Sequence, residues 1–285
     1  MWVRTIPFFF VLLWSTGFVG AKFGLPFAEP FTLLMWRMAL VVPMFALLAV
    51  ILKRPNLSLH DAAIQGLVGL LIHGIYLGLV FYAINQGVSA GLTALIVSMN
   101  PLLIAVFSSA VLNTPVRPKE WFALLLGMLG VIIVLMAPTH WQGAVQLSDI
   151  FLLLIALFAL CAGTLIQKRY AERIDLITGL SYQYAASLLY FIAMSFTLET
   201  QAVQWTSTLI ITMAWLIIAL SLASVLLLMY LIQQGDATRV ASYFYLVPPM
   251  AAFWGWLFFD EQWSWTMLVG ITLVVTALAM NRVKP

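Results

Sequence analysis

Several polar and aromatic side chains interrupt long apolar stretches of this sequence, and two pairs of them share one spacing. His73 and Tyr76 are three residues apart, so they share a helix face, and Ser221 and Ser224 repeat that spacing. A histidine can bind a carboxylate or sense protonation; alternatively, it stays neutral and donates a hydrogen bond to a neighbouring helix. The two pairs predict one bulky aromatic wall and one small polar wall of a binding cavity.

Four further side chains are candidates for contact with a ligand. Trp14 can stack on a ligand or pack against lipid, and Ser15 can face a cavity or bond the carbonyl one turn back. Arg37 lies inside an apolar run, where it can attract a substrate carboxylate; alternatively, it reaches the outer interface or caps carbonyls of the preceding run. Tyr243 is also predicted to reach the cavity.

Prolines mark candidate hinges. Ser98 and Asn100 precede Pro101, and Pro248 and Pro249 stand in a corresponding apolar run near the end of the chain. Proline frees a backbone carbonyl and bends a helix, which either exposes backbone to a cavity or merely serves packing. We predict that Ser98 and Asn100 face the substrate and that the three prolines act in gating.

The sequence lacks the residue patterns that a proton relay, a metal site or intramembrane proteolysis would need. No Asp or Glu lies well inside an apolar run, since Asp260 and Glu261 come at the end of one, so a carboxylate proton relay is not expected. His73 has no second histidine four residues away, and Cys161 is the single cysteine. The sequence therefore predicts neither a metal site, nor a cofactor, nor the catalytic groups of an intramembrane protease.

The composition requires an apolar solvent around the protein. Of the 285 residues, 64% are hydrophobic and 8% are charged, against about 25% charged residues in a soluble domain. A membrane-spanning helix needs about 20 residues, so the chain can form roughly ten spans joined by short loops. We place them at 6–22, 30–52, 64–86, 89–112, 120–137, 147–167, 177–198, 207–232, 239–259 and 264–281.

Lys and Arg collect on one side of this arrangement, as they do on the cytoplasmic side of membrane proteins. With the N-terminus inside, Lys22 falls at an outer end of a span. The inner ends hold Arg4, Lys53, Arg54, Arg117, Lys119, Lys168, Arg169, Arg173, Arg239, Arg282 and Lys284. A multi-pass protein of the plasma membrane, a bacterial inner membrane, with both termini in the cytoplasm is therefore expected.

The two halves of the chain resemble each other. Residues 82–87 read YAINQG and residues 230–235 read YLIQQG, and the same offset aligns Pro101 with Pro249. A slightly smaller offset aligns Arg37 with Gln183. Each half, 1–140 and 141–285, holds five predicted spans, so the second copy enters the membrane from the opposite side. Such an inverted repeat is typical of transporters that bind substrate between the halves.

Short motifs at corresponding places are similar to those of a known family. They are Trp14 to Phe18, Trp36-Arg37, Tyr82 with Gln86-Gly87, Asn100-Pro101, Pro248-Pro249 and Phe259-Asp260-Glu261. Together they resemble the EamA-type members of the drug/metabolite transporter superfamily. One difference from the family pattern is Asn113, which occupies the position in the first half that corresponds to Glu261.

The resemblance implies ten helices, cytoplasmic termini and a central cavity lined mainly by spans one, three, four, six, eight and nine. We therefore expect an all-α membrane protein that is a secondary transporter, an exporter of amino acids or similar small metabolites, and not an enzyme. A channel and an intramembrane enzyme are the alternatives. The expected partners are a small-molecule substrate and the lipid bilayer, without nucleic acid, for a monomer or weak homodimer.

Overall fold

The computed structural model describes residues 5–88, 90–112, 116–135, 146–170, 173–234, 240, 242–259 and 265–280. Within these ranges the chain is helical, and its single β-bridge joins Ala28 to Val203. Asn113, Asp260 and Glu261, which the motif comparison singled out, lie outside the described residues.

The first half of the chain forms helices close to the predicted spans. Its elements are α1 (Ile6–Gly24), α2 (Pro30–Ile51), α3 (Leu59–Gly69), the π-helix η2 (Leu70–Tyr76), α4 (Leu77–Asn85), α5 (Ala90–Ser98), α6 (Asn100–Leu112) and α7 (Pro118–Leu135). α3, η2 and α4 are continuous, so this helix begins five residues before the predicted start at residue 64. The predicted span 89–112 is two helices, because the α-helix is interrupted at Met99, just before Asn100-Pro101.

The second half repeats this order with different details. Its elements are α8 (Leu147–Tyr170), α9 (Leu176–Leu198), α10 (Ser207–Trp215), the π-helix η4 (Leu216–Ser224), α11 (Val225–Gln234), the 3-10 helix η5 (Tyr243–Leu246), α13 (Val247–Phe259) and α14 (Trp265–Met280). α10, η4 and α11 are continuous, as α3, η2 and α4 are. The ninth predicted span contains a 3-10 turn directly before Val247 and its two following prolines.

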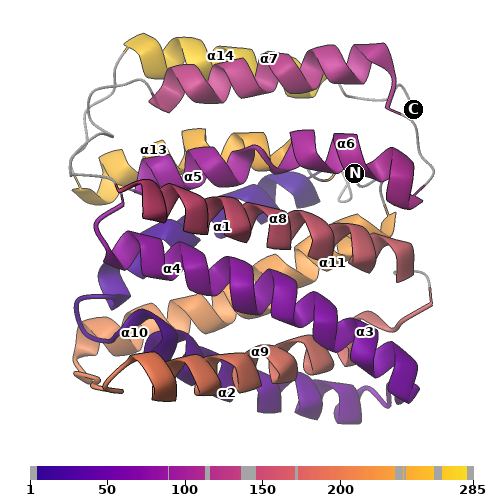
Figure 1. Ribbon diagram of the computed structural model, residues 1–285, viewed down its shortest axis with the longest axis vertical. Coiled ribbons are helices and arrows are strands. Elements are labelled where there is room, and N and C mark those ends of the chain that lie inside the picture. The colour runs from indigo at the N-terminus through magenta and orange to yellow at the C-terminus, as the bar shows by residue number, and fades with distance from the viewer. Residues whose placement is uncertain are drawn as a thin grey trace.

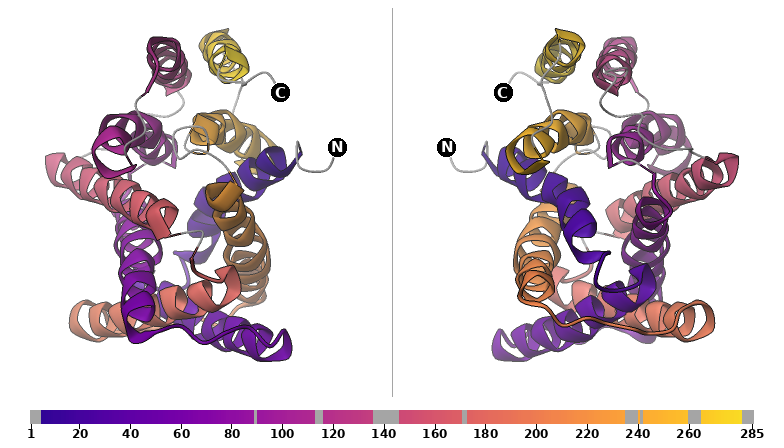
Figure 2. Two further views of the ribbon diagram at one scale, coloured as in Figure 1. Left: turned by 90° about the vertical axis from the view of Figure 1, so that its right-hand side faces the viewer. Right: turned by 90° about the vertical axis from the view of Figure 1, so that its left-hand side faces the viewer.

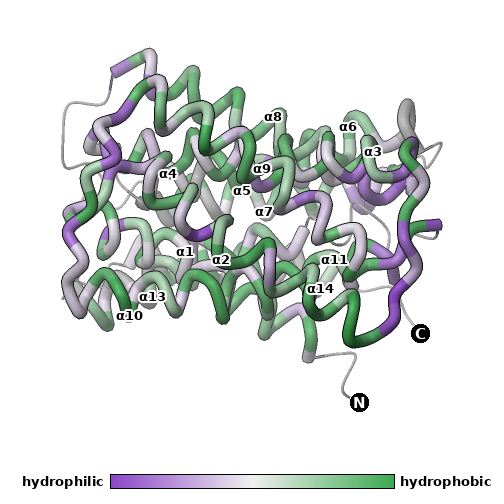
Figure 3. The backbone as a smooth tube through the Cα atoms, turned by 90° about the horizontal axis from the view of Figure 1, so that it is seen from below, coloured by the Kyte–Doolittle hydropathy of each residue, from purple (hydrophilic) through white to green (hydrophobic). Residues whose placement is uncertain are grey.

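Six helices of the described residues are long and apolar enough to cross a membrane. They are Ile6–Gly24, Pro30–Ile51, Leu59–Asn85, Leu147–Tyr170, Leu176–Leu198 and Ser207–Gln234. Hydrophilic segments gather toward two ends of the bundle, and the tube between them is mostly hydrophobic (Figure 3). The protein is therefore an all-helical membrane protein. That the shorter helices of the other four predicted ranges also cross the membrane stays a prediction.

The helices run side by side across the bundle (Figure 1). α7 packs against α14 at one edge, where both views of Figure 2 show them as a separate pair, and α2 packs against α9 at the opposite edge. Between these pairs, α3 and η2 contact α9, η2 and α4 contact α8, and α1 contacts η4 and α13. Elements from both halves of the chain thus meet throughout the interior.

Two glycines allow helix backbones to touch. A Cβ atom at Gly69 would collide with the backbone of Gln183, and the Gly69 carbonyl accepts a 3.0 Å hydrogen bond from Ser187 Oγ. At the other edge, a Cβ at Gly130 would lie 2.7 Å from the Gly270 carbonyl oxygen. Small residues are typical of such close helix contacts in membranes. The first contact fixes the position of α9 beside the central π-helix η2.

A carboxylate from α9's end caps the start of α2. Glu199 Oε1 accepts from Phe31 N at 2.8 Å, and Glu199 Oε2 accepts from Thr32 N at 2.6 Å and from Thr32 Oγ1 at 2.7 Å. These backbone groups have no partner within α2, and the helix dipole favours a negative charge there. In turn Glu29, directly before α2, accepts from the backbone N and the Oγ1 of Thr200 after α9, at 2.8 and 2.9 Å.

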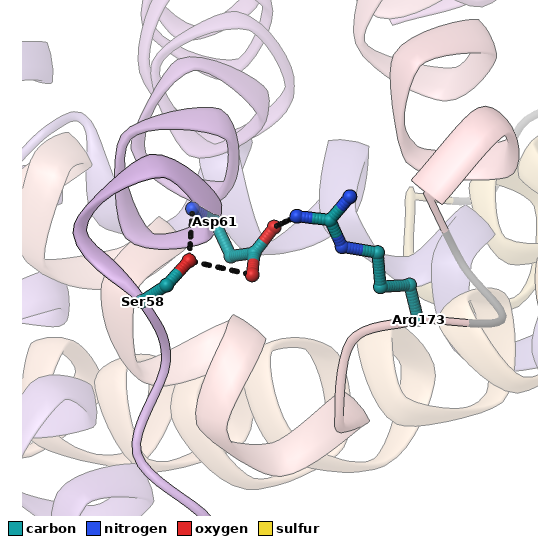
Figure 4. Close-up of polar contacts among 3 residues, drawn as sticks. All are labelled: Ser58, Asp61 and Arg173. Atoms are coloured by element: carbon teal, nitrogen blue, oxygen red, sulfur yellow. Dashed lines mark hydrogen bonds and ion pairs between the residues drawn. The ribbon is translucent and has the colours of Figure 1, made fainter.

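Salt bridges join the same elements at the opposite end of the bundle. Arg54 lies 3.5 Å from Asp175, and Arg173 donates to Asp61 at 2.7 Å. Figure 4 shows that Ser58 completes the second contact, since its hydroxyl donates to Asp61 at 2.7 Å and accepts from the Asp61 backbone N–H at 3.1 Å. Exposed ion pairs contribute little energy, about 0–1 kcal/mol each, so their main effect is to fix the loops before α3 and α9.

Removal of the Glu199 carboxylate is expected to lower stability. Glu199→Ala leaves the first N–H groups of α2 without acceptors, which costs about 1–2 kcal/mol by analogy with helix N-caps. Thermal unfolding in detergent should give a lower midpoint for this variant, with a smaller loss for Glu199→Gln, which keeps one acceptor. Glu29→Ala is the matched control, because its partners on Thr200 are exposed; an equal loss in both variants would contradict this account.

Candidate functional site

A cavity lies between the central helices of the two halves. The residues that line it come from α1, α2, η2, α4, η4 and α11. Its lining is formed by Trp14, Gly17, Phe18, Arg37, Ile72, His73, Tyr76, Leu77, Val80, Phe81, Leu220 and Val225. A concave, mostly apolar site with a few polar groups is the usual form of a small-molecule site.

Arg37 is one of the polar groups of this cavity. Its side chain is buried, with 3% of its surface exposed, and its Nε donates to Ser221 Oγ at 2.9 Å. The Ser221 carbonyl accepts from the Tyr184 hydroxyl at 3.0 Å. The arginine therefore does not reach the outer interface. It also lies in the second predicted span, which the family resemblance did not place among the main lining spans.

His73 belongs to the first half and contacts side chains of the second half. Its Nε2 is 3.1 Å from Gln183 Oε1, and its ring stacks on Tyr184 with centroids 4.6 Å apart. The Gln183 side-chain amide donates in turn to Gln65 Oε1 at 2.6 Å and Gln167 Oε1 at 3.2 Å. Since Gln183 Oε1 is an acceptor, His73 donates from Nε2. The amide network holds the imidazole ring in one orientation beside the cavity.

Both polar contacts rest on π-helical segments. His73 and Tyr76 belong to η2, and Ser221 and Ser224 belong to η4, at corresponding places of two long helices. A π-helical stretch widens the helix and shifts the side chains that follow, and such stretches are frequent at functional sites. The predicted spacing of three residues therefore lies on an irregular helix in both halves.

Aromatic rings form one wall of the cavity. Trp14 and Tyr76 stack with centroids 6.5 Å apart and an interplanar angle of 11°. Trp14 also contacts Phe10 and Phe244 at 5.3 and 5.5 Å. The tryptophan thus packs inside the protein, between α1 and η5, with one side available to the cavity.

Other predicted site residues lie elsewhere. Ser15 Oγ donates to the Leu12 carbonyl at 3.0 Å, so it bonds its own helix rather than only facing a cavity. It also accepts from Trp254 Nε1 of α13 at 2.8 Å. Ser98, Asn100 and Ser224 are buried but are not among the lining residues, and Tyr243 is half-buried against the core. Whether these residues bind substrate stays a prediction.

The proline sites coincide with irregular backbone. Pro101 follows the first residue of α6 after the break at Met99, and Pro248 and Pro249 follow the first residue of α13 after η5. All three prolines are buried. Their gating role stays a prediction.

The sequence interpretation missed four residues at this site. Gln65, Gln167, Gln183 and Tyr184 are buried and hold His73 and Ser221, although Gln183 was recognised as the counterpart of Arg37. A usable signal was present, because each amide interrupts an apolar run, where an unpaired polar group is costly.

Comparison with known proteins identifies the family. Residues 5–136 and 147–283 match the EamA-like transporter family, so the chain belongs to that family. It is 26% identical over 279 residues to the transporter YvbV of Bacillus subtilis, covering 97% of this chain and 90% of the relative. It is 24% identical over 281 residues to a probable amino-acid metabolite efflux pump of Escherichia coli, covering 95% and 91%.

Two further similarities agree with this family. The inner membrane transporter YedA of Escherichia coli K12 is 24% identical over 278 residues, covering 94% of this chain and 87% of the relative. A crystal structure at 17% identity has a TM-score of 0.77 and covers 96% of this chain and 94% of its own, which shows that the fold is shared.

The amide network predicts a large stability loss in one variant. Gln183→Ala leaves His73, Gln65 and Gln167 without this buried partner, which we expect to cost about 1–3 kcal/mol. The measurement is the unfolding midpoint in detergent. Gln86→Ala is the matched control, since its exposed amide donates to Tyr82 at 3.2 Å and should change the midpoint little. A Gln183 variant as stable as this control would argue against the network.

Proposed function

We propose that this protein is a secondary carrier that moves small organic metabolites, such as amino acids or related compounds, by alternating access. The substrate binds in the cavity that Arg37, His73, Tyr76 and Trp14 line. Residues 1–140 and 141–285 form two inverted five-helix repeats that rock about this site.

The observation that carries this proposal is an exchange of contacts between the halves. Arg37 of the first half bonds Ser221 of the second, and Gln183 of the second half bonds His73 of the first. The sequence repeat aligns Arg37 with Gln183 and His73 with Ser221. Two halves related by a pseudo-two-fold axis produce such a reciprocal pair, and the substrate sites of inverted-repeat transporters lie at that kind of interface.

The ends of α2 and α9 repeat the pattern. The start of α2 is bound by Glu199 at the end of α9, and Arg54 after α2 is bound by Asp175 at the start of α9. This reciprocity supports an antiparallel α2–α9 pair that serves as a common frame. The irregular backbone at Pro101 and at Pro248-Pro249 supplies places where helices can bend while the frame stays intact.

We propose an orientation with both termini in the cytoplasm of a bacterial cell and export as the direction. This orientation is supported by Arg54 and Arg173, which bind acidic partners at the end of the bundle expected to be cytoplasmic. The Escherichia coli relative whose name is an efflux pump supports export.

A counterflow assay tests the carrier. Purified protein in liposomes loaded with a panel of metabolites should exchange one or more of them with saturation, and internal substrate should accelerate uptake of labelled substrate. The same panel should raise the unfolding midpoint, because a ligand that binds the folded state stabilises it. Ohmic conductance without saturation would instead indicate a channel.

Loss of the His73 ring is expected to impair binding. In His73→Ala the substrate loses a polar contact, so we expect apparent affinity in counterflow to fall by about tenfold, the equivalent of one hydrogen bond, with membrane insertion retained. His60→Ala is the matched control, because His60 is exposed and is not among the cavity-lining residues. Unchanged counterflow kinetics in His73→Ala would remove this residue from the site.

A further inference from the structure

We infer that the substrate is an organic monocarboxylate with an apolar body, and that Arg37 binds its carboxylate. The inference rests on the proposed transport function and narrows the substrate from amino acids and related compounds to carboxylates without an ammonium group. It comes from the charge of Arg37, the groups around it, and the composition of the cavity wall.

Arg37 is a buried cation without a counter-charge in the described part of the chain. The ion pairs found there join Arg54 to Asp175 and Arg173 to Asp61, both away from the cavity. Arg37 Nη1 is buried and has no hydrogen-bond partner among the described residues. An unpaired charge inside a membrane protein is costly, so such groups are usually paired or serve a ligand.

The guanidinium group is held in place before any ligand arrives. Ser221 accepts from Nε at 2.9 Å, and Ser221 is itself bound through its carbonyl by Tyr184. With Nε occupied, the terminal nitrogens remain for a ligand. A guanidinium edge matches the two oxygens of a carboxylate, and such charge-assisted bonds are among the strongest in proteins.

The remaining wall suits an uncharged apolar body. Phe18, Leu77, Val80 and Phe81 line the cavity, together with the stacked pair of Trp14 and Tyr76. These side chains bury apolar atoms but offer few hydrogen bonds. A ligand with one anionic group at Arg37 and an aliphatic or aromatic remainder therefore matches both parts of the site.

The charges of the lining residues argue against two related classes of ligand, zwitterionic amino acids and phosphate dianions. The described lining residues include no Asp or Glu, so the ammonium group of a zwitterionic amino acid would lack a carboxylate partner. Arg37 is the single fixed cation among those residues, which is one charge too few to neutralise a phosphate dianion. A monocarboxylate without an amino group leaves no charge unpaired.

Four probes of one shape test this assignment on the wild-type protein. They are 3-phenylpropionate, the neutral 3-phenylpropanamide, the zwitterion phenylalanine and the cation phenethylamine. We expect 3-phenylpropionate to bind at least about tenfold more tightly than the other three, in thermal stabilisation and in inhibition of counterflow. Equal affinity for the acid and its amide, or tighter binding of phenylalanine, would overturn the inference.

Variants of Arg37 test whether this residue causes the preference for the carboxylate over the amide. Arg37→Gln should reduce affinity for 3-phenylpropionate at least about tenfold and leave that for the amide within about twofold, whereas Arg37→Lys should retain part of the preference. Arg117→Gln is the matched control, because Arg117 is exposed outside the cavity. A charge preference that persists undiminished in Arg37→Gln would place the carboxylate elsewhere. If Arg37→Gln fails to fold, the wild-type comparison still decides.

The outcomes separate this inference from the proposed function. Saturable counterflow of other metabolites without preference for 3-phenylpropionate would leave a carrier and reject the monocarboxylate. Stabilisation by chloride or phosphate alone would reject it in favour of an inorganic anion. Absence of counterflow across the entire metabolite panel would instead reject the carrier.

Discussion

Two buried polar contacts between the halves are the interactions on which the cavity depends. Arg37 bonds Ser221, and Gln183 bonds His73, so each half supplies one long polar side chain and one partner on a π-helical segment. Inside a membrane these groups cannot form hydrogen bonds with water, and an unpaired one would cost several kilocalories per mole. The polar contacts therefore fix which faces of α2, η2, α9 and η4 point inward, and the cavity lies where those faces meet.

Close backbone packing makes these contacts possible. The approach of α3 to α9 at Gly69 brings Gln183 within reach of both His73 and Gln65. The capping of α2 by Glu199 sets the position of α2 along α9, and with it the depth of Arg37. The paired helices α2 and α9 thus carry Arg37 and Gln183, whereas Pro101 and Pro248-Pro249 lie in α6 and α13, which pack mainly against other helices. The alternating access that we propose for this member of the EamA-like family uses such a division, because its site must stay intact while other helices move.

Much of the site could be anticipated from the sequence because a polar side chain in an apolar run is conspicuous. Trp14, Arg37, His73 and Tyr76 were selected in this way, and all four line the cavity. Ser15 was selected by the same rule but bonds its own helix and Trp254. The rule detects that a side chain needs a partner; it does not reveal the partner. The internal repeat aligned Gln183 with Arg37, but it did not reveal the hydrogen bond between Gln183 and His73.

The sequence by itself determined the helical class, the membrane as solvent and the approximate bounds of the helices, because apolar length and helix-ending residues are local properties. Only the tertiary structure decided the break at Met99, the π-helical stretches and the partners of the buried polar groups. His73 and Gln183 are 110 residues apart, and Arg37 and Ser221 are 184 apart, so no local pattern encodes these bonds. They form because packing of the helices leaves each buried polar group beside the few others that can satisfy it.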